Sequence, residues 1–166
     1  MYDSSIVPIS HSLKALAAIL RKAEAYCEAR KIDPAALLTA RLFPDMLPLA
    51  RQVQLATDHA KGCGARLAGI ANPSFPDEEK TFSELQARLG KTLDFLGGLK
   101  PEHLAGAATR TVTIKVGGKD VERTGAAYLS TSALPNFYFH VTTAYNILRH
   151  NGLEIGKGDF LGRTLS

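Results

Sequence analysis

Residues 45–68 read DMLPLARQVQLATDHAKGCGARLA, and the spacing of the apolar residues in this stretch decides the fold. These residues recur at alternating intervals of four and three, which places them on one stripe of an α-helix. Many are small, so a neighbouring helix can approach closely. Pro48 is tolerated in a first helical turn, and Gly69 suits the end of the helix. The stripe consists of Leu49, Val53, Ala56, Ala60, Cys63 and Leu67.

The segment before it predicts a helix of the same kind. Residues 8–30 carry apolar side chains at the same four-three spacing, and Pro8 is expected in the first turn, where its missing N–H costs nothing. A shorter helix is expected over residues 35–42, with Asp33 as its cap. Phe43-Pro44 ends it, because the residue before a proline is pushed out of the helical region.

Two more long helices follow. Thr81 and Glu84 match a capping box, which starts a helix that ends at Gly97-Gly98. The last helix is expected from about Pro135 to Asn151-Gly152, with a left-handed cap at its end. We expect the hydroxyl residues 130–132 to cap its start and the tail to pack along the bundle.

The segment between these two helices predicts a β-hairpin. Val112, Ile114 and Val116 alternate strictly, and Gly117-Gly118 supplies the positive φ of a tight turn. A lone hairpin is marginal in water, so it should lie against the helices or a partner subunit. The predicted fold is therefore an all-α, up-and-down four-helix bundle with a β-hairpin inserted between helices three and four. Residues 1–166 are expected to form a single domain.

Composition excludes several classes of protein. Apolar residues make up 45% of the chain and charged residues 22%, and the net charge is only +4. Basic residues are scattered among acidic ones and there is no Trp, so a nucleic-acid surface is not expected. No secretion signal or membrane span is visible, and the two cysteines form no disulfide framework. We expect a soluble cytoplasmic protein.

One polar line on the second helix carries the candidate site. Asp45, Gln52, His59 and Arg66 recur every seven residues and therefore share one flank. On the last helix, the four-residue spacing of Asn136 and His140 lets both side chains face one object. If the two helices are neighbours, two imidazoles meet across a groove, which is the beginning of a divalent metal site.

Three interpretations of these residues stay open: hydrogen-bonded bundle histidines, a bound metal, or a metal-free polar site. A catalytic zinc normally has three protein ligands and an open position, whereas Asn136 would add only a weak carbonyl oxygen to His59 and His140. Cys63 lies within a turn of His59, so a thiol role is a further alternative. No GxSxG nucleophile motif occurs.

The chain resembles the DinB/YfiT-like superfamily of metalloenzymes, and within it an uncharacterised bacterial branch. The resemblance covers nearly the whole length. It implies an up-and-down four-helix bundle, often a homodimer, that holds a metal through one His on the second helix and an HxxxH pair on the last. Some members are thiol-dependent transferases or isomerases, and some are hydrolase-like. The residues that carry the resemblance are 42–46, 57–60, 75–85, 136–140 and 148–152.

Carried over residue by residue, the resemblance gives a degenerate site. His59 looks like the ligand on the second helix and His140 like the later His of the pair, but Asn136 occupies the position of the earlier His. The resemblance therefore implies that Zn, Ni or Fe is weakly held or absent. Two functions are expected as alternatives: a two-His site for a divalent metal or small polar ligand, or a non-catalytic dimeric binding or scaffold protein.

Overall fold

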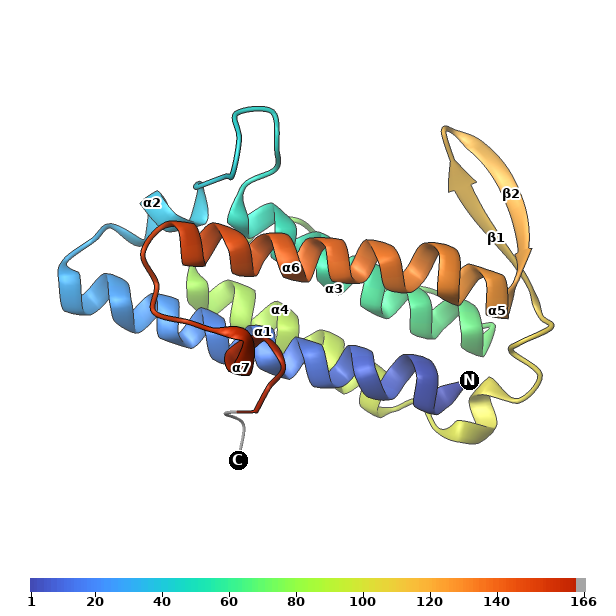
Figure 1. The fold of residues 1–166 in the computed structure, drawn as a ribbon. Helices are drawn as coiled ribbons and strands as arrows, with labels where there is room; N and C mark the ends of the chain where they lie inside the picture. The colour runs from blue at the N-terminus through green and yellow to red at the C-terminus, as the bar shows by residue number, and fades with distance from the viewer. Residues whose placement is uncertain (164–166) are drawn as a thin grey trace.

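The computed structural model describes residues 1–163, and within them four long helices lie side by side (Figure 1). They are α1 (Tyr2–Arg30), α3 (Leu49–Ala68), α4 (Phe82–Gly97) and α6 (Leu134–His150). Antiparallel strands β1 (Thr111–Val116) and β2 (Lys119–Thr124) form a hairpin. The shorter elements are α2 (Pro34–Leu38), a 3₁₀ turn η1 (Pro101–Leu104), α5 (Gly125–Tyr128), a π turn η2 (Leu129–Ala133) and α7 (Lys157–Phe160). The predicted helical bundle with an inserted hairpin is confirmed.

The long helices do not simply alternate in direction. Arg88 of α4 pairs with Asp58 of α3, while further along both helices Leu96 lies against Gly64, so α3 and α4 run parallel. α1 and α6 run the opposite way (Figure 1). The expected up-and-down alternation therefore holds between α1 and α3 but not between α3 and α4. Residues 69–81 are long enough, when extended, to return along the roughly 30 Å of α3.

A buried guanidinium fixes this returning segment to the bundle. Arg88 is only 2% exposed and forms ion pairs with Asp58 at 2.8 Å, Asp77 at 3.0 Å and Glu79 at 3.1 Å. It also donates to the carbonyl of Pro76 at 2.9 Å. Asp77 and Glu79 belong to the returning segment and Asp58 to α3, so one side chain joins three parts of the chain.

The first helix begins earlier than predicted. α1 starts at Tyr2 and continues through Pro8, which lies inside the helix rather than in its first turn. Proline removes only the hydrogen bond that its own N–H would make to the carbonyl of Ser4. Burial of Ile6 and Ile9, which are 2% and 0% exposed, favours continuation of the helix through this position.

The second long helix begins later than predicted, and the short helix ends earlier. α3 starts at Leu49, with Pro48 as an extended N-cap, and α2 ends at Leu38. The late start of α3 follows from proline, since Leu47 precedes Pro48 and is kept out of the helical region. No local signal in the sequence accounts for the early end of α2. The predicted capping box that starts α4 is confirmed in both of its hydrogen bonds.

The last helix begins at Leu134, close to the predicted Pro135, but it is preceded by helical turns that were not predicted. Thr124 caps α5 by accepting from the N–H of Ala127 at 3.3 Å, and helical structure then continues through the π turn into α6. The expectation that residues 130–132 cap a new helix was therefore wrong. The hydroxyls of Ser130 and Thr131 instead donate to carbonyls four residues earlier. Such bonds are compatible with an ongoing helix.

The end of the chain packs along the bundle, as predicted for the part that the structure describes. Gly152 has a φ of 92° and turns the chain after α6. Leu153 and Ile155 are then buried, and Lys22 of α1 pairs with Asp159 of α7 at 2.6 Å. Residues 164–166 of the predicted tail lie outside the described residues.

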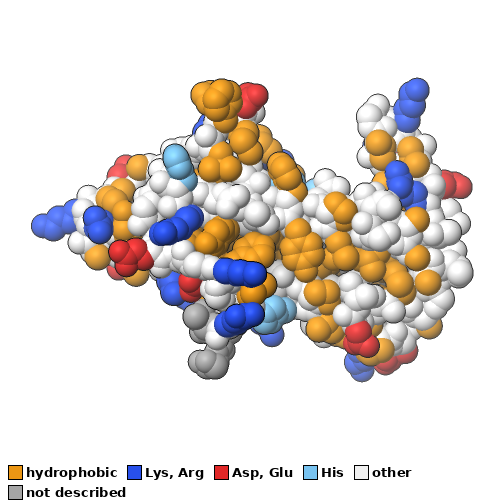
Figure 2. Space-filling view, in the orientation of Figure 1, with side chains coloured by type: hydrophobic (Ala, Val, Ile, Leu, Met, Phe, Trp, Pro, Cys, Tyr) orange, Lys and Arg blue, Asp and Glu red, His pale blue; other side chains and the backbone are white. Residues whose placement is uncertain are grey.

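The hairpin stands away from the bundle (Figures 1 and 2) and is joined to it at its base. The N–H of Gly125 donates to the carbonyl of Arg110 at 2.8 Å, and the Arg110 guanidinium donates to the carbonyl of Leu67 at the end of α3. Gly117 and Gly118 make the tight turn with φ of 56° and 80°, as predicted. Exposure rises along β1, from 3% at Val112 to 48% at Val116.

The core runs the length of the bundle, and its largest fully buried side chains include Phe82 and Phe137. Ala56, Ala60 and Cys63 of the predicted stripe on α3 are all 0% exposed, as expected for a close helix contact. Both cysteines are free and buried.

No helix within residues 1–163 combines the length and the apolar character needed to cross a membrane.

Candidate functional site

The structure brings the two predicted histidines together. The rings of His59 on α3 and His140 on α6 stack with centroids 5.3 Å apart and planes inclined by 13°. His140 is 8% exposed and lies behind His59, which is half-buried. The seven-residue repeat on α3 predicted the right flank for this contact, because Gln52, His59 and Arg66 all lie on the side that faces α6 or the hairpin.

Gln52 fixes the orientation of His140. The side-chain N–H of Gln52 donates to the carbonyl of Leu47 at 3.0 Å, so its oxygen, Oε1, faces the ring nitrogen Nδ1 of His140 at 2.7 Å. An amide oxygen only accepts hydrogen bonds, so Nδ1 carries the proton and donates. The other nitrogen, Nε2, then keeps its lone pair.

Both imidazoles are held neutral at pH 7. Burial, with smaller contributions from His59 and Arg51, lowers the pKa of His140 to about 4. Burial also lowers the pKa of His59, and the charges of Arg66 and Lys61 act in the same direction while Asp58 opposes them. Neutral rings can stack without mutual charge repulsion and can offer both a donor and an acceptor.

Acid is expected to destabilise the protein through His140. Its folded pKa of about 4 lies below the usual value of 6.5, so the unfolded chain takes up a proton first as the pH falls between these values. Stability from this group is complete above pH 6.5 and is lost towards pH 4, by about 3 kcal/mol. Urea unfolding at several pH values measures this loss.

The matched variants for this measurement are His140→Gln, which cannot titrate, and His150→Gln, which changes an exposed residue at the end of α6. We expect the first to have a shallower acid slope than the wild type and the second to keep the wild-type slope. Equal slopes in all three proteins would show that His140 does not titrate at a depressed pKa.

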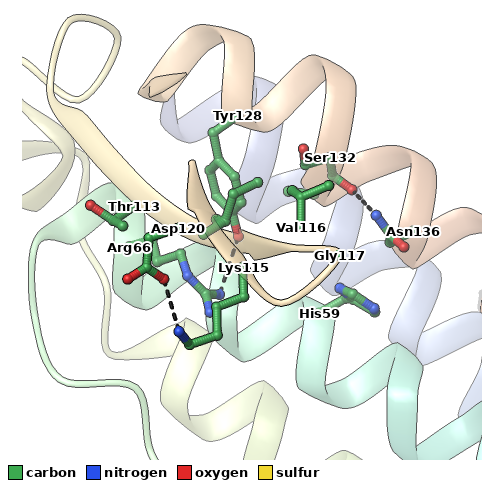
Figure 3. Close-up of a pocket in the computed structure, with 12 residues that line it drawn as sticks. His59, Arg66, Thr113, Lys115, Val116, Gly117, Asp120, Tyr128, Ser132 and Asn136 are labelled. Carbon is green, nitrogen blue, oxygen red and sulfur yellow. Dashed lines mark hydrogen bonds and ion pairs between the residues drawn. The ribbon is translucent and has the colours of Figure 1, made fainter. Parts of the chain in front are cut away.

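A cavity of about 740 Å³ lies between the hairpin and the bundle, and we call it the hairpin cavity (Figure 3). α3 contributes His59 and Arg66 to its wall, and the last helical stretch contributes Tyr128, Ser132 and Asn136. Ala133 completes the helical side. The hairpin side consists of Thr113, Ile114, Lys115, Val116, Gly117 and Asp120. His140 does not line the cavity, but its ring stacks on that of His59, which does.

Asn136 lines the same cavity as His59, whereas His140 does not. Its amide N–H donates to the carbonyl of Ser132 at 2.7 Å, one helical turn earlier. Asn136 is exposed, so its amide oxygen is open to solvent. It could therefore offer a neutral oxygen to a ligand.

The donor set does not fit a tightly held transition metal. Within residues 1–163, no group of three or more His, Cys, Asp and Glu side chains gathers where it could hold a metal ion. His59 and His140 supply two imidazoles, and an uncharged amide is a poor third ligand. A catalytic zinc normally has three protein ligands and a structural zinc four.

Cys63 is not placed as a reactive thiol. It is 0% exposed, and burial raises the pKa of its thiol to about 12, so it stays protonated at neutral pH. Arg66 and Gln52 had no individual role predicted from the sequence, and Tyr128 was not singled out at all. The seven-residue repeat contained the first two, but nothing in the sequence pointed to Tyr128.

Comparison with known proteins agrees with this architecture. A crystal structure of a DinB family member protein from Shewanella denitrificans is 45% identical in sequence, with a TM-score of 0.88, and the match covers 97% of this chain and 91% of that one. None of the curated proteins matches the sequence. The predicted DinB-like character is confirmed, whereas metalloenzyme character stays a prediction. Because the model of a domain of unknown function, DUF1993, matches residues 1–161, the chain belongs to that DinB-like family.

Proposed function

We propose that this protein binds a small polar molecule in the hairpin cavity, with His59 as the central hydrogen-bonding group. The observation that carries this proposal is the stack of His59 on His140 beside a cavity of about 740 Å³. Known ligand pockets span roughly 300 to 1,000 Å³ and combine apolar walls with a few placed polar groups. Ile114 and Val116 supply apolar wall here, and Ser132 and Asn136 supply polar groups.

Gln52 supports this use of the histidine pair. It holds the ring of His140 in place, and that ring in turn supports one face of His59. A pre-oriented side chain loses less conformational freedom when a ligand binds. An imidazole supported on one face by a second ring at the wall of an open cavity is what supports the proposal.

In this proposal the bundle works without a resident metal. Two imidazoles and the amide of Asn136 would hold zinc, nickel or iron weakly at most. The function proposed is binding rather than a named reaction. The homodimer expected from the resemblance stays a prediction.

A fragment titration followed by NMR tests the proposal. Small polar fragments, including neutral amides such as benzamide, are added to the isotope-labelled protein. We expect shifts to concentrate on residues that line the hairpin cavity and the affinity to fall about fivefold in His59→Ala, since a ligand hydrogen bond contributes on the order of 1 kcal/mol. The matched control, His150→Gln, should bind as the wild type does.

Treatment with a chelator separates the metal-free site from a metal site. Protein dialysed against EDTA should bind the same fragments with unchanged affinity. Fragment binding that disappears with EDTA and returns with zinc would contradict the proposal in favour of a metal centre. Shifts that map to other surfaces, or none at all, would contradict any ligand function of the cavity.

A further inference from the structure

Arg66 is a cation in the hairpin cavity without an anionic partner. Among the described residues no carboxylate lies within ion-pair distance of its guanidinium. Arg51 of α3 and Arg88 of α4, by contrast, both form ion pairs with carboxylates. Its side-chain hydrogen bond goes to the hydroxyl of Tyr128, to which the guanidinium donates at 3.3 Å. Arg66 is half-buried, so its charge is only partly screened by water.

Gly62 makes room for this guanidinium. The side chain of Arg66 runs back along α3, and a Cβ on Gly62 would collide with its terminal nitrogen Nη1. Glycine inside a helix is less favourable than alanine, so this position weakens α3 locally. In return, the end of the guanidinium reaches the helix surface at Gly62, within about one turn of the level of His59.

Tyr128 completes a pair of donors. It is 4% exposed, and the guanidinium carbon of Arg66 lies 5.8 Å from the centre of its ring. Because its hydroxyl oxygen accepts from Arg66, the hydroxyl hydrogen remains able to donate (Figure 3). Guanidinium and phenol hydrogens beside one another are suited to an oxyanion.

The charge of the cavity indicates a single negative charge on the ligand. Lys115 and Asp120 form an ion pair at 2.9 Å on the hairpin, so they neutralise one another. With His59 neutral, Arg66 leaves the lining with one net positive charge. A carboxylate balances this charge, whereas a phosphate dianion would leave one negative charge uncompensated.

We propose that the hairpin cavity takes a small organic acid, whose carboxylate binds to Arg66 and Tyr128 while its other end hydrogen-bonds to His59. This inference rests on the proposed function and adds the chemical class of the ligand. Arg66 then selects acids over their neutral amides, and the His59–His140 stack receives an uncharged group about one helical turn away.

Calorimetric titration with benzoate, benzamide and inorganic phosphate tests the carboxylate end of this assignment, since neither organic probe carries a second polar group for His59. Benzoate and benzamide have nearly the same shape and differ in charge. We expect benzoate to bind at least about tenfold more tightly than benzamide, because a hydrogen bond to a charged group contributes about 1.5 to 3 kcal/mol. Phosphate should bind more weakly than benzoate.

Three variants locate the effect. Arg66→Gln should remove the preference for benzoate. Gly62→Ala should fold, because only the end of a flexible side chain has to move, and should weaken benzoate binding by displacing the guanidinium. The matched control, Arg21→Gln, changes an exposed arginine of α1 outside the cavity lining and should bind benzoate as the wild type does.

The outcomes separate this inference from the proposed function. If benzoate and benzamide bind equally well in the cavity, or if Arg66→Gln keeps the preference, the acid assignment is wrong and the cavity still binds ligands. Phosphate binding more tightly than benzoate also overturns the carboxylate assignment. If fragments and acids alike leave the cavity resonances unshifted, both proposals fail.

Discussion

Replacement of Arg88 by methionine is expected to lower the free energy of unfolding by about 2 to 3 kcal/mol, because it removes the charge-assisted hydrogen bonds of a buried guanidinium to three carboxylates. Arg88 is 2% exposed and pairs with Asp58, Asp77 and Glu79 at 2.8 to 3.1 Å. Methionine restores most of the volume but none of the charge. The remaining negative charges would then repel one another at the point where residues 69–81 return along the bundle.

Urea unfolding is the suitable measurement, since guanidinium chloride would screen the same charges. The matched control is Lys115→Met, which breaks the ion pair with Asp120 on the hairpin, where the two side chains are 74% and 64% exposed. Exposed pairs contribute about 0 to 1 kcal/mol, so this control should unfold close to the wild type. An Arg88→Met protein that is as stable as the control would show that the returning segment is held by other contacts.

Gly125→Ala is the second substitution with a large expected effect, and we expect it to destabilise the protein by about 2 to 3 kcal/mol. A Cβ at this position would overlap the carbonyl oxygen of Ala107 and lie 3.2 Å from the side chain of Leu67. The obstacle is backbone, which cannot rotate away as a side chain can. Gly125 follows β2, so relief of the overlap has to move the base of the hairpin.

Gly90→Ala is the matched control, because it adds the same methyl group where nothing lies within 4 Å. It removes a glycine from the interior of α4 and should stabilise the protein by about 0.5 to 1 kcal/mol. Thermal unfolding of the two variants should therefore change in opposite directions. A Gly125→Ala protein with the wild-type melting temperature would refute the close approach of Gly125 to Ala107.

Local sequence signals predicted the helices well where hydrophobic spacing and caps act together. The capping box at Thr81 and the glycine pair at 117–118 each fixed an element correctly, because their hydrogen bonds and backbone angles are determined by nearby residues. The start of α1 was misplaced because Pro8 was taken as a boundary, and the helical turns before α6 were missed because Pro135 was. Burial of Ile6 and Ile9, and the cap by Thr124, override that local preference.

The candidate site was predictable only in part, for the same physical reason. Helical periodicity placed Gln52, His59 and Arg66 on one flank, and the meeting of His59 with His140 then required only that α3 and α6 be neighbours. The hairpin cavity depends on how β1 and β2 are held above α3, which no local pattern encodes. The parallel course of α4 depends likewise on the long-range partners of Arg88.

The attachment of the hairpin at its base gives the fold a means of diversification. Its tip makes the tight turn at Gly117 and Gly118, and around it the side chains are exposed, yet the strands form one wall of the cavity. Insertions, deletions or exchanged residues in the strands can therefore reshape the compartment while the helices beneath keep their packing. Grafting the hairpin of a homologue onto this bundle is a direct route to altered ligand preference in a stable protein.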